Sequence, residues 1–220
     1  MSMDLSPLWI SLKVALVSTI ITFTLGVLSA WFMTNYRGKG AALIDGLMTL
    51  PMVLPPTLVG FILLWIIGVN GPIGKLLGIW DIKIVFTWFA AVLASVVVSF
   101  PLMYRTSRGA FDQINMDLIH AARTLGSTEK EVFLRIVVPL AWPGIAAATA
   151  LAFSRALGEF GATLMVAGSI PGKTETIPIA IYFATQGGDY KRAAVWVIIV
   201  FAISLVSMMF INRYQNKTVK

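Results

Sequence analysis

One pair of ionisable residues lies inside a long apolar stretch. Arg155 and Glu159 are four residues apart, so a helix would present both side chains on one face. A charged side chain deep in a bilayer costs at least ~2.5–3.5 kcal/mol, so this arginine should face protein or water. Two interpretations stay open. Arg155 forms a positive rim where an anion enters a pathway, or the pair only fixes helix packing. Thr163 could add a hydroxyl for an oxyanion, or bond its own helix backbone.

The chain offers little for catalysis. It has no cysteine, one histidine, and neither a GxSxG nor an HExxH motif. We therefore expect no catalytic residue, no metal site and no cofactor bound by this chain itself. The segment from Gly168 to Thr174 ends in GKT like a P-loop, but Ala167 stands where the motif needs glycine, and no strand precedes it. This segment is expected to be a turn.

The longest polar interval runs from 105 to 138 and holds nine of the chain's 27 charged residues. Within it, apolar residues at helical spacing predict a short helix, which Gly126 can end in the left-handed conformation. Thr128 and Glu131 match a capping box, so a second helical stretch is expected to run until Pro139. Two short helices separated by one glycine predict a rigid knob that a soluble partner could bind. The expected apolar face of the first helix is Leu118, Ala121, Ala122 and Leu125.

Composition predicts an all-α integral membrane protein. The chain is 58% hydrophobic and 12% charged, and its 220 residues fit one domain. Segments long and apolar enough to cross a bilayer predict five transmembrane helices in a domain over 6–211, followed by a basic tail over 212–220. The expected spans are about 8–34, 41–69, 84–104, 140–168 and 193–211, with the polar loop 105–138 between the third and fourth.

Two of these spans should be interrupted. Pro51, Pro55 and Pro56 break the hydrogen-bond ladder of the second span. Freed carbonyls at membrane depth are tolerated only against protein or a water-lined cavity, so this segment either lines a pathway or is a kinked structural helix. A straight helix over 140–168 would be about 43 Å long, too long for a ~30 Å core. We therefore expect a break near Gly158 and Gly161.

The charge distribution predicts the topology. The first turn, the knob loop and the tail lie on one side and hold ten basic residues, whereas the opposite loops hold five. Because basic residues favour the cytoplasmic side, the knob and the C-terminus are predicted to be cytoplasmic and the N-terminus outside. The net charge of +7 therefore fits a multi-pass protein of the cell membrane, and no long basic run indicates nucleic acid.

The knob resembles the "EAA" loop of the permeases of bacterial ABC importers. The matching positions are Ala121, Ala122, Gly126, Ile136 and Pro139, while His120 replaces the family's glutamate and Val138 its leucine. The segments LPPTLVGFILL, SFPLMYR and RALGEFGAT extend the resemblance over nearly the whole chain, to the molybdate-specific branch of the family. Sulfate and tungstate permeases are similar in the last segment.

The resemblance implies a type I importer transmembrane domain that works as a homodimer with the pathway at its interface. Two cytoplasmic ABC ATPase subunits would bind ATP and Mg, and an external binding protein would deliver molybdate. The residues expected to couple to the ATPase are Leu118, His120, Ala121, Ala122, Leu125 and Gly126. The pathway candidates are Pro55, Pro56, Arg155, Glu159 and Thr163.

Three alternatives compete with this interpretation. An intramembrane enzyme would need a nucleophile and base that the sequence lacks. A passive channel would need no ATPase-docking knob, so capture of a P-loop ATPase separates it from a permease. The third alternative is the same machine with a different anion, namely tungstate, sulfate or thiosulfate, because selectivity is expected to lie in the binding protein.

Overall fold

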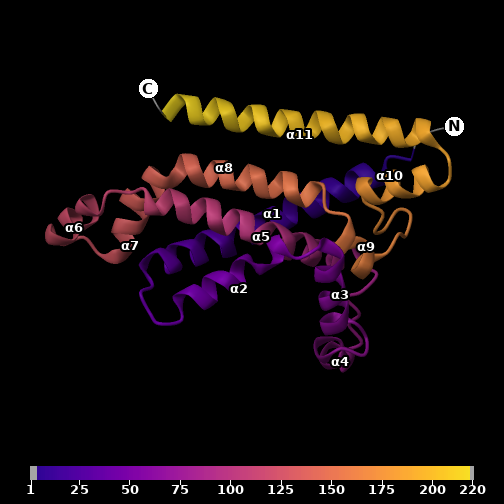
Figure 1. Cartoon of the computed structure of the whole chain (residues 1–220), viewed down its shortest axis with the longest axis horizontal. Helices are drawn as coiled ribbons and strands as arrows, with labels where there is room; N and C mark the ends of the chain where they lie inside the picture. Colours follow the sequence, from indigo (N-terminus) through magenta and orange to yellow (C-terminus); the bar gives the residue numbers. More distant parts are fainter. Residues whose placement is uncertain (1–3, 219–220) are drawn as a thin grey trace.

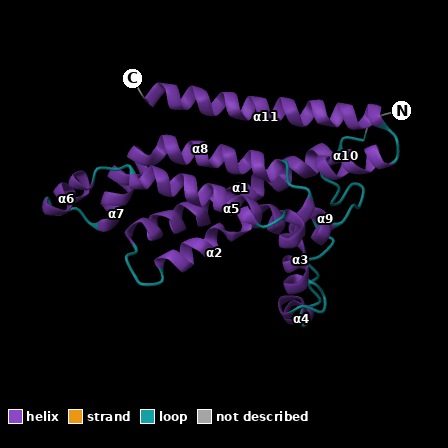
Figure 2. Ribbon diagram, in the orientation of Figure 1, coloured by secondary structure: helices purple, strands orange, loops and turns teal. Residues whose placement is uncertain are grey.

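The computed structural model describes residues 4–218, and all regular structure in that part of the chain is helical (Figures 1 and 2). The expected all-α fold is therefore confirmed. The elements are α1 Ser6–Asn35, α2 Ala41–Val53, α3 Pro56–Ile67, α4 Pro72–Gly78, α5 Trp88–Asp112, α6 Met116–Thr124, α7 Glu129–Val132, η1 Phe133–Val137, α8 Val138–Leu157, α9 Gly161–Ala167, α10 Ile177–Gln186 and α11 Tyr190–Thr218.

Among residues 4–218, four helices are long and apolar enough to cross a membrane. They are α1, α5, the uninterrupted helix Glu129–Leu157 and the apolar part of α11. Helices α2 and α3 pass the same test together, but they are bent by 112° at their junction, so the count is five if this pair forms one span. The expected interruption of the second span is thus a sharp break between two helices.

Helices α1, α5 and α8 form the core of the molecule. Their contact is close because Gly26 on α1 faces α5, where an added Cβ would lie 2.5 Å from the Cγ atom of Met103. Buried hydroxyl groups also meet across this contact, with Thr22 Oγ1 and Ser99 Oγ 3.2 Å apart. Small residues and interhelical hydrogen bonds hold helices together in lipid, where apolar burial gives no advantage.

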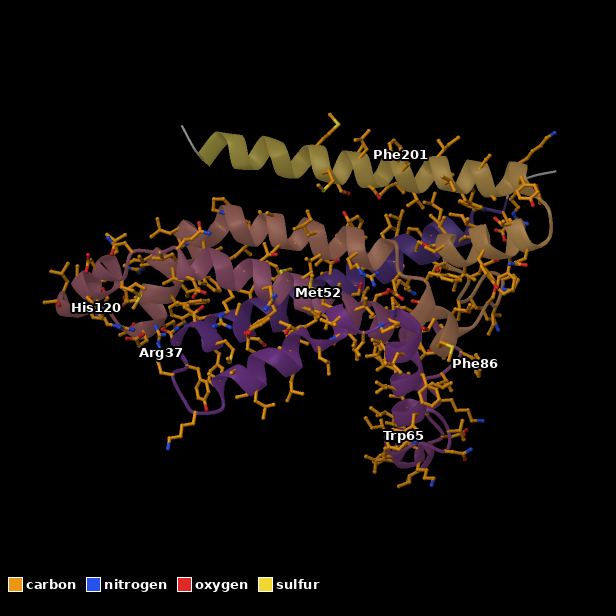
Figure 3. All side chains as sticks on the ribbon, viewed as in Figure 1. Arg37, Met52, Trp65, Phe86, His120 and Phe201 are labelled. Atoms are coloured by element: carbon orange, nitrogen blue, oxygen red, sulfur yellow. The ribbon has the colours of Figure 1, made fainter. Side chains whose placement is uncertain are left out.

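The segment α2–α3–α4 forms an arm on this core. No residue of α2 is buried, and α3 projects away from the bundle with α4 at its end (Figure 1). The break follows from the sequence, because Leu54 and Pro55 are extended and Pro56 begins a new helix. Trp65 lies near the far end of this arm and is 68% exposed (Figure 3).

From the sequence we expected the second helix of the knob to end at Pro139, but this prediction was wrong. It continues through η1 into α8 as one helix, Glu129–Leu157. The turn before the proline is a π-helix, in which the Val138 N–H bonds to the Phe133 carbonyl. A proline ring clashes with the carbonyl four residues earlier, and the wider π turn relieves this crowding. Pro139 therefore coincides with a local change from α-helical to π-helical hydrogen bonding, and the helix continues past it.

The predicted break in the fourth span is present. Helix α8 ends at Leu157 with Gly158 as its C-cap, and the short helix α9 begins at Gly161. The segment predicted as a basic tail continues helix α11 up to Thr218, with Val219 and Lys220 outside the described residues. The knob and the C-terminal end of α11 lie at one end of the molecule, and the N-terminus lies at the other (Figure 1).

Candidate functional site

The knob is a well-fastened structure at one end of the bundle. The Asn115 side chain caps α6 by accepting from the Asp117 N–H at 2.8 Å. Gly126 then turns the chain with φ +86°, in the left-handed region predicted for it. The predicted capping box is also confirmed, because the Thr128 side chain accepts from the Glu131 N–H and the Glu131 side chain accepts from the Thr128 N–H. Each end of the loop between α6 and α7 is thus fixed by a local contact.

The knob is also fastened to the bundle. Ile119 and Ala122 on α6 are buried in the main hydrophobic cluster. At its base, the ring of Trp31 on α1 packs against Phe111 and Phe133, with centroid distances of 5.6 and 5.2 Å. The position of α6 therefore depends on α1, α5 and η1 together.

The apolar face expected for α6 is only partly correct. Of its four residues, Ala122 faces the bundle, whereas Leu118 and Leu125 are 48% and 87% exposed and Ala121 is exposed as well. The buried face is instead made by Ile119 and Ala122, because the apolar residues of this short helix lie on two sides. The exposed apolar side chains remain free for another molecule, and His120 projects at the outer end of the knob (Figure 3).

An ion pair joins the two helices of the knob beside the C-terminal end of α1. Arg123 donates from Nε to Glu129 Oε1 at 2.7 Å and from Nη2 to Glu129 Oε2 at 2.9 Å. This hydrogen bonding to Glu129 raises the pKa of Arg123. The pair joins α6 to α7 across the Gly126 turn, and both partners are largely exposed. A bidentate ion pair fixes the relative orientation of the two helices, although an exposed pair contributes little to the free energy of folding.

At the opposite end of α8, Glu159 bridges the break between α8 and α9. Arg155 donates from Nη1 to Glu159 Oε2 at 2.7 Å, and Glu159 Oε1 accepts from the Ala162 N–H at 2.8 Å. The Glu159 side chain is only 1% exposed, whereas that of Arg155 is 34% exposed. Both carboxylate oxygens are therefore used within the chain, and the guanidinium is the member of the pair that reaches the surface.

Pro55 and Pro56 meet this break from α3, whereas Thr163 lies on α9. Gly161 packs against Pro56 and Thr57, where an added Cβ would lie 3.2 Å from the Pro56 Cβ atom. One turn further, Gly60 faces the Cα atom of Ala162. Pro55 caps α3 and is exposed, and Thr163 is buried on α9 with its hydroxyl unpartnered among the described residues. Pro56, Arg155 and Glu159 thus belong to one junction of two broken helices.

Sequence reasoning missed a polar network on the N-terminal half of α2. Tyr104 and Arg108 on α5 both donate to Asp45 Oδ1, and Arg108 Nη1 also donates to the Tyr104 hydroxyl at 3.1 Å. Asp45 and Arg108 are 63 positions apart, so no local spacing connects them. The available signal was a carboxylate near the end of an apolar segment, which should have a partner.

Comparison with known proteins decides the family. The model of the binding-protein-dependent transport system inner membrane component matches residues 22–220. The chain belongs to this family. It is a multi-pass inner membrane component of a transport system and not an enzyme, as expected.

Curated relatives align with the permease over most of its length. A putative molybdenum transport system permease protein, YvgM, of Bacillus subtilis is 43% identical over 97% of this chain and 93% of its own. The molybdenum transport system permease protein ModB of Escherichia coli K12 is 43% identical over 91% and 88%. The sulfate transport system permease protein CysT of Salmonella typhimurium is 36% identical over 94% and 75%.

Solved structures support the fold of the permease. A bacterial ABC transporter for alginate import aligns with a TM-score of 0.78 at 18% identity, covering 98% of this chain and 80% of that chain. An inward-facing form of the MetNI methionine ABC transporter aligns with a TM-score of 0.77 at 17% identity, covering 96% and 94%. The chain therefore shares the all-helical fold of these ABC transporter chains, as expected.

Proposed function

We propose that this chain is the permease subunit of an ATP-driven importer of molybdate. The observation that carries the proposal is the 43% identity to molybdenum transport permeases over nearly the whole chain. A sulfate permease is less similar, at 36% identity. Two copies of the chain form the working unit, with the pathway between them. An external binding protein delivers the tetrahedral dianion to them.

The knob couples this permease to a separate ATPase. Its rigid attachment supports this role, because Ile119 and Ala122 anchor α6 while Leu118 and Leu125 stay exposed at the water-facing end. A groove in each of two ATPase subunits receives α6, including Ala121 and His120. The ATPase subunits bind ATP and Mg, so this chain needs no cofactor of its own.

The orientation proposed for the permease rests on the basic residues at the knob end of the molecule. The knob, the turn containing Arg37 and the C-terminal end of α11 lie at the end opposite the N-terminus (Figures 1 and 3). These segments carry most of the basic residues, which supports a cytoplasmic position for all of them and an external N-terminus.

The junction of α3 with α8 and α9 lies on the pathway in this proposal. Its broken backbone needs protein or water beside it at membrane depth, and the partly exposed Arg155 supplies positive charge. Glu159 holds that arginine in place. The exposed Pro55 and Pro56 line the same region, and Thr163 is buried beside it on α9.

The substrate is tested by ATP-dependent uptake in vesicles containing the reconstituted complex. Labelled molybdate, tungstate and sulfate are compared at equal concentration, each with its cognate binding protein. Molybdate uptake that stops without ATP is the expected result. Uptake of sulfate alone would move the chain to the sulfate branch, and uptake without ATP would identify a channel.

Coupling is tested at Gly126. Replacing Gly126 by Trp places a bulky side chain at a φ of +86° and on the exposed turn of the knob. We expect ATP hydrolysis to continue while uptake falls at least tenfold. The control is Gly126→Asn, because asparagine tolerates the left-handed conformation and is small. Normal uptake by the Gly126→Trp complex would contradict the coupling role.

A further inference from the structure

The inner half of the second span is fastened to the bundle mainly by one polar network. On α5, the buried Tyr104 and the partly exposed Arg108 both donate to the carboxylate of Asp45 on α2. Arg108 also bonds to the Tyr104 hydroxyl, so the three side chains form a closed triangle. Charge-assisted hydrogen bonds of this kind are about twice as strong as neutral ones.

Other contacts of α2 with the bundle are weak. Ala41, Ile44 and Met48 are only partly buried where they pack against the core. No residue of α2 is fully buried, whereas Gly26 of α1 is pressed against α5. In lipid, apolar side chains gain nothing by touching protein instead of acyl chains, so close packing and polar contacts must hold a helix. Helix α2 lacks close packing and therefore depends on its polar contacts.

Both ends of α2 are flanked by non-helical segments. The turn Arg37–Gly40 precedes it, and the extended pair Leu54–Pro55 follows it. A helix of 13 residues between two non-helical joints can move as a rigid piece. The remaining restraint on such motion is the contact between α2 and α5.

We infer that Asp45, Tyr104 and Arg108 form a polar lock that controls whether α2 is docked on α5. These are positioning residues, and none of them is assigned to substrate. The side chains of Arg108 and Asp45 are 31% and 28% exposed, so water can replace their contact when it opens. A fully buried pair would be too costly to separate in each cycle. Partial exposure therefore makes the network releasable.

The lock lies where the knob can act on it. Arg108 is on the last turns of α5, and α6 of the knob begins at Met116, directly after α5 ends. Asp45 is on α2, which leads through the break to α3 and its contact with α9. Displacement of the knob therefore strains the contact between Arg108 and Asp45. This step rests on the proposed function, because it assumes that an ATPase moves the knob.

The test uses the cysteine-free chain in the full reconstituted complex. A spin label at Leu47→Cys reports the mobility of α2, and one at Leu16→Cys on α1 serves as the reference, because both positions are exposed. Asp45→Asn should increase the undocked fraction at Leu47 roughly tenfold, as expected for losing a charge-assisted hydrogen bond. Tyr104→Phe should have a smaller effect in the same direction. The label at Leu16 should not respond to either change.

The matched control is Asp112→Asn. Asp112 lies 3.7 Å from Arg108 Nε on the same helix, so its loss removes a charge beside Arg108 without touching α2. It should leave the Leu47 spectrum unchanged. The charge swap Asp45→Arg with Arg108→Asp should restore part of the docked population, which a purely structural loss of fold would not do.

Unchanged Leu47 spectra in both Asp45→Asn and Tyr104→Phe would overturn the lock. An equal response to Asp112→Asn would also overturn it. These spectra do not depend on the substrate, so failed molybdate uptake with a normal response at Leu47 would reject the proposed anion and leave the lock standing. The second readout is ATP hydrolysed per anion transported, which should rise several-fold in Asp45→Asn.

Discussion

Helix α2 is held in the bundle by contacts of a different kind from those that join the core helices α1 and α5. Between α1 and α5, Gly26 lets the backbones approach so closely that an added Cβ would overlap Met103. Along α2, no residue is fully buried. The core is thus held by shape, which tolerates little movement, whereas α2 is held by a few polar atoms. Fixed and movable parts of a membrane protein can therefore be distinguished by what occupies their helix contacts.

The largest expected effect comes from breaking the close packing of the core. Gly26→Leu should destabilise the protein by about 3 kcal/mol, because overpacking forces backbone shifts at the α1–α5 contact. The matched control is Gly46→Leu on α2, where the space is open and a change within ~0.5 kcal/mol is expected. Thermal unfolding in detergent measures both. Equal losses in the two variants would remove the distinction between core and arm.

A smaller effect should follow from opening the junction of α8 and α9. Glu159→Ala leaves Arg155 and the Ala162 N–H without their shared acceptor and should cost about 2 kcal/mol. Glu159→Gln keeps an oxygen for the Ala162 N–H and should lose less. The same unfolding assay ranks them. If Glu159→Gln were as damaging as Glu159→Ala, the charge of Glu159 would matter and its capping of α9 would not.

The smallest expected effect concerns the hydroxyl groups of the core. Thr22→Val removes the contact with Ser99 Oγ but keeps the shape of the side chain, and it should cost about 0.6 kcal/mol. Ser99 keeps a second partner in the Ser95 carbonyl, at 2.6 Å. A loss as large as that of Gly26→Leu would show that hydrogen bonds, not close packing, hold the core.

Features that depend on a few neighbouring residues were predictable from the sequence. The capping box of Thr128 and Glu131, the left-handed Gly126 and the break between Gly158 and Gly161 are all found as expected. Each rests on the conformational preferences of residues within one or two helical turns. Such preferences act regardless of how the helices later pack.

Features that depend on packing were not predictable. The triangle of Asp45, Tyr104 and Arg108 joins two helices far apart in the chain. Pro139 looked like a helix end, but a π turn accommodates it, and Phe133 at the start of that turn packs against α1 and α5. The roles assigned to the knob and junction residues stay predictions, because they require partners that the sequence does not contain.

The uninterrupted helix Glu129–Leu157 connects the knob directly to the junction of α8 and α9. It begins inside the knob and ends beside Glu159, so its 29 residues run from one face of the bundle to the far junction without a flexible link. Such a rod is about 43 Å long, and tilting it by roughly 10° about one end swings the other by roughly 7 Å. A tilt of this helix about the knob would thus appear at the junction of α8 and α9 as a displacement of roughly 7 Å.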